Sequence, residues 1–170
     1  MKQLLTNPVF NWSLIGVISV VLMAVALFYE YALNIPPCVV CVHVRLWVTA
    51  VLGLSVAGIA LAGRPWAQVV LWLGFLASAI VLVERAWQLL GIENGWILAE
   101  CGVQTNPGLP AWFPLHDWLP VLYRPETTCG VSPELLFGIT MSEGTMAFAV
   151  LFTIAAFGGL VKAGATALRL

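Results

Sequence analysis

The sequence contains very little charge. Only 9% of its 170 residues are Asp, Glu, Lys or Arg, whereas 61% are hydrophobic. A soluble domain carries about 25% charged residues, so this composition excludes a soluble globular protein and predicts a membrane protein. The formal net charge of −1 also excludes the cationic surface that nucleic-acid binding needs. Function must therefore be sought in the few polar side chains.

Motifs for tightly bound cofactors are also missing. The sequence has no glycine-rich dinucleotide turn, no C-x-x-C-H for covalent haem and no dense histidine cluster, and we expect no metal site. The length allows four spans of about 20 residues, with about 90 residues left for the ends and connections. We therefore expect one integral membrane domain over residues 1–170, with an all-α fold that forms a four-transmembrane-helix bundle.

Four apolar runs are long enough to cross a bilayer. We expect spans at residues 14–33, 42–62, 66–83 and 145–161.

A long extracytoplasmic loop is expected at residues 84–144. It holds six of the ten prolines, which argue against a long regular helix. Four apolar residues within it recur at spacings of 3, 3 and 4, which predicts a short interfacial helix. Alternatively, these residues cap the bundle. They are Trp112, Leu115, Trp118 and Leu122.

Basic residues predict the orientation of the bundle. The two terminal flanks and the turn between spans two and three carry four basic residues and no acid, so this side is expected to be cytoplasmic. The basic residues are Lys2, Arg64, Lys162 and Arg169, and all eight acids lie on the other side. A signal peptide cleaved near residues 24–26 is the alternative, but its removal would leave three spans.

All four cysteines fall on the extracytoplasmic side. Cys38 and Cys41 stand at the mouth of the second span, while Cys101 and Cys129 lie in the long loop. In bacteria that side is oxidising, so two disulfides are expected, and the spacing favours Cys38–Cys41 and Cys101–Cys129. Four cysteines allow three connectivities, so the spacing leaves the others open.

The C-x-x-C motif indicates redox or metal chemistry, because a disulfide across so small a loop stabilises a fold weakly. Cys41 stands at the start of a helix, where backbone N–H groups favour a thiolate. Arg45 lies one turn further on the same face and favours the thiolate of Cys41 too. A charge inside a span is a functional candidate by default, although Arg45 could instead snorkel to the interface.

Other polar residues are less informative. His43 either relays protons or forms a hydrogen bond at the membrane boundary, and His116 is expected at the surface. Glu30 and the Glu84-Arg85 pair are interpreted as marks of the boundary.

A cycling pair of disulfides needs an electron sink, and the bilayer offers a lipid-soluble quinone. Arg45 is placed to polarise a quinone carbonyl, and we expect Cys41 and His43 to belong to the quinone site with it. The Cys101–Cys129 pair closes a segment rich in proline and glycine, which favours an exchanging disulfide. The alternative is a static staple of about 3 kcal/mol or somewhat more.

The sequence resembles the disulfide bond formation protein B (DsbB) family in four features. They are the Pro-Cys-x-x-Cys motif at residues 37–41, the arginine four residues after Cys41, the two loop cysteines and the stretch from Pro110 to Pro120. Members are membrane thiol:quinone oxidoreductases of the bacterial inner membrane. They relay electrons from a periplasmic thioredoxin-like oxidase, DsbA, to ubiquinone or menaquinone. The resemblance covers most of the chain.

By position, the resemblance implies roles for five residues. Cys101 would form the mixed disulfide with the partner, and Cys129 would be its loop partner. Cys38 and Cys41 would be the quinone-coupled pair, with Cys41 contacting the ring and Arg45 assisting. The runner-up is a vitamin K epoxide reductase-like protein, although there the loop pair precedes the C-x-x-C. A membrane scaffold whose cysteines bind zinc or staple the loop is the alternative from another class.

Overall fold

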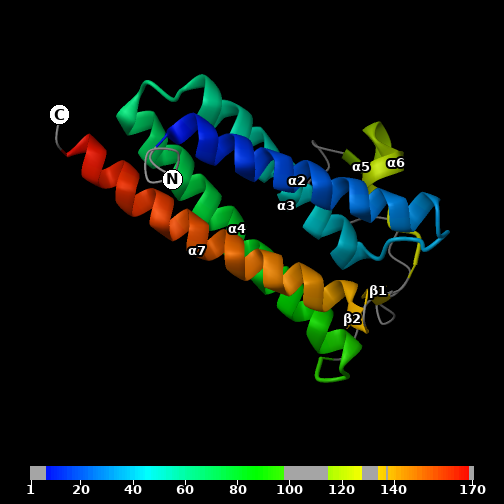
Figure 1. Cartoon of the computed structure of the whole chain (residues 1–170). Helices are drawn as coiled ribbons and strands as arrows, with labels where there is room; N and C mark the ends of the chain where they lie inside the picture. The colour runs from blue at the N-terminus through cyan, green and yellow to red at the C-terminus, as the bar shows by residue number, and fades with distance from the viewer. Residues whose placement is uncertain (1–6, 98–114, 128–133, 137, 169–170) are drawn as a thin grey trace.

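The structure is a computed structural model that describes residues 7–97, 115–127, 134–136 and 138–168, with only the backbone of residues 116 and 134–136. Four long helices dominate these ranges: α2 (Pro8–Tyr31), α3 (Val39–Ala60), α4 (Pro65–Glu93) and α7 (Met141–Ala167). Each is long and apolar enough to cross a membrane. α2 packs against α3, α3 against α4 and α4 against α7, in one bundle (Figure 1). The expected all-α bundle is confirmed, and the chain is a multi-pass membrane protein.

The third span is longer than the sequence predicted. We expected it to end at residue 83 and the loop to begin at residue 84, but α4 continues to Glu93. Polar side chains taken as boundary marks instead bond to one another along the helix. Arg85 Nη1 donates to Gln88 Oε1 at 3.0 Å, and Gln88 Nε2 donates to Glu84 Oε1 at 3.4 Å. The prediction of the loop's first residue was therefore wrong.

The expected interfacial helix is present as two short pieces. α5 covers Leu115–Trp118, and α6 covers Pro120–Tyr123. Pro120 starts the second piece because proline fits the first turn of a helix but breaks an interior turn. Trp118 is exposed, as an interfacial residue would be. Trp112 lies outside the described residues.

Two short strands precede α7, and the sequence analysis did not expect them. β1 (Glu134–Leu136) and β2 (Ile139–Thr140) pair as an antiparallel hairpin. Gly138 lies between them with φ of 78°, a conformation that glycine adopts without steric cost. The side chain of Thr140 then caps α7 through the backbone N–H of Glu143. The hairpin thus leads the chain directly into the last span.

The bundle has two distinct ends (Figure 1). The start of α2, the connection from α3 to α4 and the end of α7 lie together at what we call the Trp12 end. The connection from α2 to α3 lies at the opposite end with α5, α6 and the hairpin, and we call this the cysteine end. The four spans therefore return the chain to the end from which α2 starts.

Tightly packed aromatic rings fill the bundle near the Trp12 end. The ring centroids of Trp12 and Trp72 lie 4.5 Å apart, and those of Phe75 and Phe152 lie 5.5 Å apart. Glycine admits these rings: a Cβ built on Gly159 would come within 2.3 Å of the Trp72 ring. Close helix contact through small residues is a common means of association in membranes.

Candidate functional site

The C-x-x-C motif lies at the start of α3, and a cysteine of the motif caps this helix terminus. Cys38 is the residue that precedes the helix, and its sulfur accepts a hydrogen bond from the backbone N–H of Cys41 at 3.3 Å. From the sequence we expected the helix terminus to favour the sulfur of Cys41. The structure directs this N–H at Cys38, so both thiols share the electrostatic influence of the helix start.

The two sulfurs of the motif are in direct contact. Cys38 Sγ lies 2.9 Å from Cys41 Sγ, as a hydrogen-bonded dithiol. Cys38 is buried and Cys41 is partly buried. A disulfide needs about 2.05 Å between its sulfurs, so only a small movement is required once two electrons and two protons have left the pair. The structure therefore brings together the two cysteines predicted as one pair.

A cavity of about 70 Å³ lies beside these sulfurs. Cys38, Cys41 and Arg45 line it, and the other polar lining residues are Tyr29, Thr127 and Thr145. His43 is not among the lining residues. The walls are otherwise largely apolar and come from several helices; among them are Ala26, Ile35, Val44, Leu89 and Met141.

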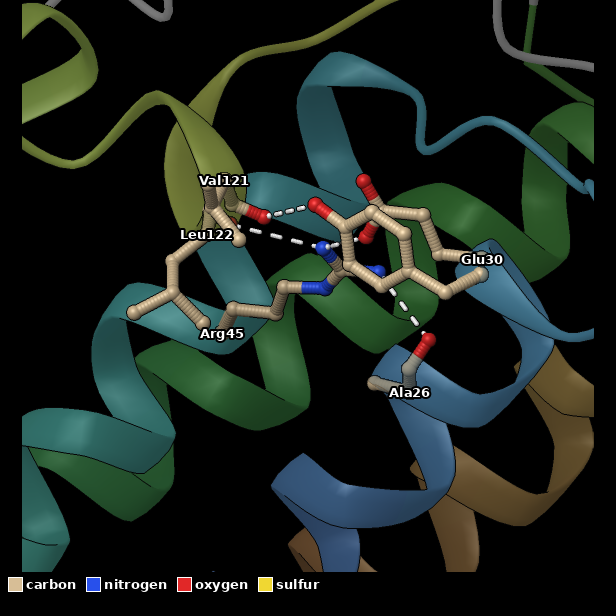
Figure 2. Close-up of polar contacts among 6 residues, drawn as sticks. Ala26, Glu30, Arg45, Val121 and Leu122 are labelled. Carbon is tan, nitrogen blue, oxygen red and sulfur yellow. Dashed lines mark hydrogen bonds and ion pairs between the residues drawn. The ribbon is translucent and has the colours of Figure 1, made fainter.

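Arg45 lies inside the bundle rather than at its surface. Its side chain is 7% exposed, and Nη1 lies 2.5 Å from Glu30 Oε2. Nη1 also donates to the carbonyl of Leu122 at 3.4 Å, and Nη2 donates to the carbonyl of Ala26 at 3.2 Å. Figure 2 shows the guanidinium held between α2 and the segment that contains Leu122. The structure thus differs from the alternative of a snorkelling arginine.

Glu30 is the site residue that sequence reasoning missed. It was interpreted as a boundary mark, yet its carboxylate pairs with Arg45 and its side chain is only 12% exposed. The signal available was an acid inside an apolar run, which is costly unless it is paired. The partner could not be read from the sequence because the two residues are on different helices and meet through helix packing.

The short helix α6 is attached to the bundle above this ion pair. The hydroxyl of Tyr31 donates to the carbonyl of Val121 at 2.8 Å (Figure 2). The hydroxyls of Thr49 and Tyr123 lie 2.7 Å apart, and Tyr123 is buried. Together with the bond from Arg45 to Leu122, these contacts fix a segment of the long connection on α2 and α3.

The chain that leads towards Cys129 runs beside Cys38. Thr127 forms a parallel β-bridge with Cys38. The carbonyl of Pro37 accepts from the backbone N–H of Glu126 at 3.0 Å and from that of Thr127 at 3.4 Å. Cys129 follows Thr127 by two residues in the sequence. Both loop cysteines, Cys101 and Cys129, lie outside the described residues, as does the side chain of His116.

Comparisons with known proteins identify the family of this chain. The model of the family described as "Disulfide bond formation protein DsbB" matches residues 9–158. A disulfide bond formation protein B of Shewanella loihica is 36% identical over 143 residues, which cover 78% of this chain and 77% of the relative. The protein of that name from Haemophilus influenzae is 31% identical, with coverages of 85% and 81%. Disulfide bond formation protein B 2 of Pseudomonas aeruginosa is 30% identical over 86% of each chain.

These matches span most of the four-helix bundle and include the cysteine motif at the start of α3. They support a membrane oxidoreductase that forms disulfides. The chain therefore belongs to the DsbB family of disulfide bond formation proteins.

Proposed function

We propose that this protein is a protein-dithiol:quinone oxidoreductase of the bacterial inner membrane. It takes two electrons from a periplasmic thioredoxin-like protein of the DsbA type and passes them to ubiquinone or menaquinone, and so generates disulfides de novo. The observation that carries the proposal is the contact of Cys38 and Cys41 beside a cavity that Arg45 also lines. Membership of the DsbB family supports it.

The proposed orientation places both termini in the cytoplasm and the cysteines on the periplasmic side. Arg64 lies in the connection at the Trp12 end, and Lys162 lies in the last turns of α7 at the same end. Glu93 belongs to the cysteine end, where α4 finishes. Basic residues in short flanks favour the cytoplasmic side. An oxidising periplasm is also the compartment in which disulfides persist.

The cavity matches the chemistry of a quinone head group. Its apolar walls suit the ring, and Arg45 supplies N–H donors for a carbonyl oxygen. At about 70 Å³ it is smaller than the cavity of roughly 150 Å³ that encloses a benzene ring. The cavity would therefore hold a carbonyl edge of the ring beside Arg45 rather than the whole ring. When bound, it accepts two electrons and two protons and becomes a quinol.

The loop pair accepts electrons first. A thiolate of the partner attacks Cys101 of the Cys101–Cys129 disulfide and displaces Cys129. The second thiol of the partner then attacks the mixed disulfide, so the partner leaves oxidised and the loop pair is left as a dithiol. Two electrons and two protons have moved from the partner to the loop.

The second exchange brings these electrons to the cavity. The Cys129 thiolate attacks Cys38 of the Cys38–Cys41 disulfide and displaces Cys41. Cys101 then attacks Cys129, which restores the loop disulfide and leaves Cys38 and Cys41 as the dithiol that faces the quinone. The β-bridge between Cys38 and Thr127 supports this order, because it holds the chain next to Cys129 beside Cys38.

Anaerobic quinone reduction tests the proposal. Purified protein is mixed with a reduced thioredoxin-like donor and an excess of quinone, and the loss of quinone absorbance is compared with the disulfide formed in the donor. We expect one quinone reduced for each disulfide formed. A scaffold with zinc-bound or permanently paired cysteines would neither bleach the quinone nor form a mixed disulfide.

Replacement of Cys101 tests the entry point. Cys101→Ser is expected to prevent the mixed disulfide with the donor, as seen on a non-reducing gel, while Cys129→Ser leaves Cys101 able to form it. Trapping through Cys129 in the Cys101 variant would reverse the two roles.

A further inference from the structure

The carboxylate of Glu30 stands behind the arginine of the cavity. Arg45 and Ala26 line the cavity, whereas Glu30 is not among the lining residues. Glu30 nevertheless makes the shortest of the three contacts of the guanidinium, at 2.5 Å from Nη1. Glu30 is therefore placed to influence a ligand of this cavity through Arg45.

We infer that Glu30 is a positioning residue, whose carboxylate holds the Arg45 guanidinium in the orientation that receives a quinone carbonyl. This inference rests on the proposed function and adds to it a residue on a second helix. It assigns Glu30 to the quinone step and not to the exchange with the partner protein.

The contact of Glu30 differs in kind from the other two. Ala26 and Leu122 offer neutral main-chain oxygens, at 3.2 Å and 3.4 Å. The guanidinium donor is charged in all three contacts, but only Glu30 is also a charged acceptor, so this contact adds the attraction of an ion pair. Ala26 and Glu30 are four residues apart on α2, so they face Arg45 from one side of that helix. Glu30 is thus the main determinant of where the guanidinium points.

The remaining donors of Arg45 make the orientation matter. A guanidinium has five N–H groups in a fixed plane, and the three contacts to Glu30, Leu122 and Ala26 occupy three of them. Within the described part of the chain the other two donors have no acceptor, so they are the ones that could serve a carbonyl oxygen of the ligand. Because the plane is rigid, a rotation that follows the loss of Glu30 changes the direction of all the remaining donors at once.

Burial makes such a rotation favourable once the carboxylate is gone. The side chains of Arg45 and Glu30 are 7% and 12% exposed, so water can hydrate the charge of Arg45 only slightly. A buried charge that loses its partner is strongly destabilised and seeks other acceptors. Arg45 would then move towards the carbonyls of α6 or towards solvent.

The experiment compares Glu30→Ala, Arg45→Ala and the double variant of the full chain in detergent. Steady-state KM and kcat are measured for quinone and for the reduced donor. Glu30→Ala and Arg45→Ala should each raise the quinone KM about tenfold, the effect of one charge-assisted hydrogen bond. The double variant should match Arg45→Ala alone, because the inference has Glu30 act on the quinone through Arg45. In all three variants, kcat/KM for the reduced donor should stay within about twofold of the value for the unchanged protein.

Two further variants complete the test. Glu30→Gln keeps an acceptor of the same size, so it should restore part of the quinone affinity and also serve if Glu30→Ala does not fold. Glu84→Ala is the matched control, because Glu84 is an exposed acid near the same end of a neighbouring helix. It should leave the quinone KM unchanged.

The outcomes distinguish a failure of the positioning role of Glu30 from a failure of the proposed function. If Arg45→Ala raises the quinone KM but both Glu30 variants leave it within about twofold, the positioning role is wrong and the proposed function stands. If the quinone KM of the double variant rises about a hundredfold, Glu30 acts independently of Arg45, which also overturns the inference. If Arg45→Ala itself leaves the KM unchanged, the arginine's proposed role fails as well.

Discussion

Each end of the bundle contains a cavity, and the larger one is not beside the cysteines. The cavity at the Trp12 end has a volume of about 290 Å³, against about 70 Å³ at the cysteine end. No cysteine lines the larger cavity; Gln68, Trp72 and Lys162 are among its lining residues. Volume alone would therefore place the site at the wrong end of the molecule. We therefore base the proposed site on the lining residues, because a thiol can be oxidised reversibly and an amide cannot.

Buried polar groups serve different purposes at the two ends. Gln68 is neutral and well bonded: it accepts from Trp12 Nε1 at 2.7 Å and donates to the carbonyls of Gly58 and Leu61. Such a satisfied network makes packing rigid and specific. Arg45 is instead charged, is paired with another charged residue and contacts α6 of the long connection. Changes at the two ends should therefore separate stability from electron transfer.

The largest effect is expected from Cys41→Ser at the cysteine end. This change removes the thiol that stands one turn before Arg45 on α3, so quinone reduction should fall to the background rate even when the protein is fully reduced beforehand. Rapid mixing of reduced protein with quinone under anaerobic conditions measures the transfer.

Cys101→Ser is the matched control for Cys41→Ser. Reduced beforehand, it should still reduce one equivalent of quinone, because Cys38 and Cys41 remain. Continued quinone reduction by the Cys41 variant would assign the electron donor to another thiol.

The next effect is expected at the Trp12 end, from Gly159→Ala. The added methyl group would lie within 2.3 Å of the Trp72 ring, so the two helices must shift. Overpacking of this kind costs about 1–3 kcal/mol of stability. Thermal unfolding in detergent should show a lower Tm, with the quinone KM of the folded protein unchanged.

Gly158→Ala provides the control at the neighbouring position. A Cβ there meets nothing within 4 Å, and alanine favours a helix over glycine, so the Tm should not fall. Equal losses in the two variants would show that the contact between Gly159 and Trp72 is not what stabilises this end.

The four spans could be predicted from sequence because each depends on one local property. An apolar run of about 20 residues is enough to identify a membrane helix. The end of α4 could not be placed this way: Glu84, Arg85 and Gln88 look like a boundary, but they bond along the helix and let it continue to Glu93. Polarity indicates where a helix meets a polar environment and not where it stops.

The site was only partly readable for a related reason. The contact between Cys38 and Cys41 follows from their spacing, since three residues make nearly one helical turn. The pair of Glu30 with Arg45 and the position of Thr127 beside Cys38 depend on how separate segments pack. No local pattern encodes such contacts, so the sequence reveals which residues carry chemistry but not which residues orient them.

A smaller effect is expected from Glu126→Pro, which alters the route between the two cysteine pairs. Proline removes the N–H that donates to the carbonyl of Pro37 at 3.0 Å. One backbone hydrogen bond contributes about 0.5–1.5 kcal/mol, so exchange between the loop pair and Cys38–Cys41 should slow by about two- to tenfold. Rapid quenching followed by thiol labelling measures this step.

Glu126→Ala keeps the N–H and removes only the carboxylate, so it should exchange at the normal rate. A slowdown of the same size in both variants would assign the effect to the charge of Glu126 rather than to the strand contact with Pro37.

The smallest effect on quinone reduction is expected from His43→Ala at the cysteine end. The sequence left two roles for His43, a proton relay or a hydrogen bond at the membrane boundary. His43 lies two residues from both Cys41 and Arg45 on α3, which places it on a different face of the helix, and it is not among the residues that line the cavity. A relay must come within hydrogen-bond reach of the reacting groups, directly or through one water. We therefore expect kcat and the quinone KM of His43→Ala to stay within about twofold, measured across pH 6 to 8. A loss that grows as the pH changes would restore the relay and would require a proton path to the thiols from the far side of α3.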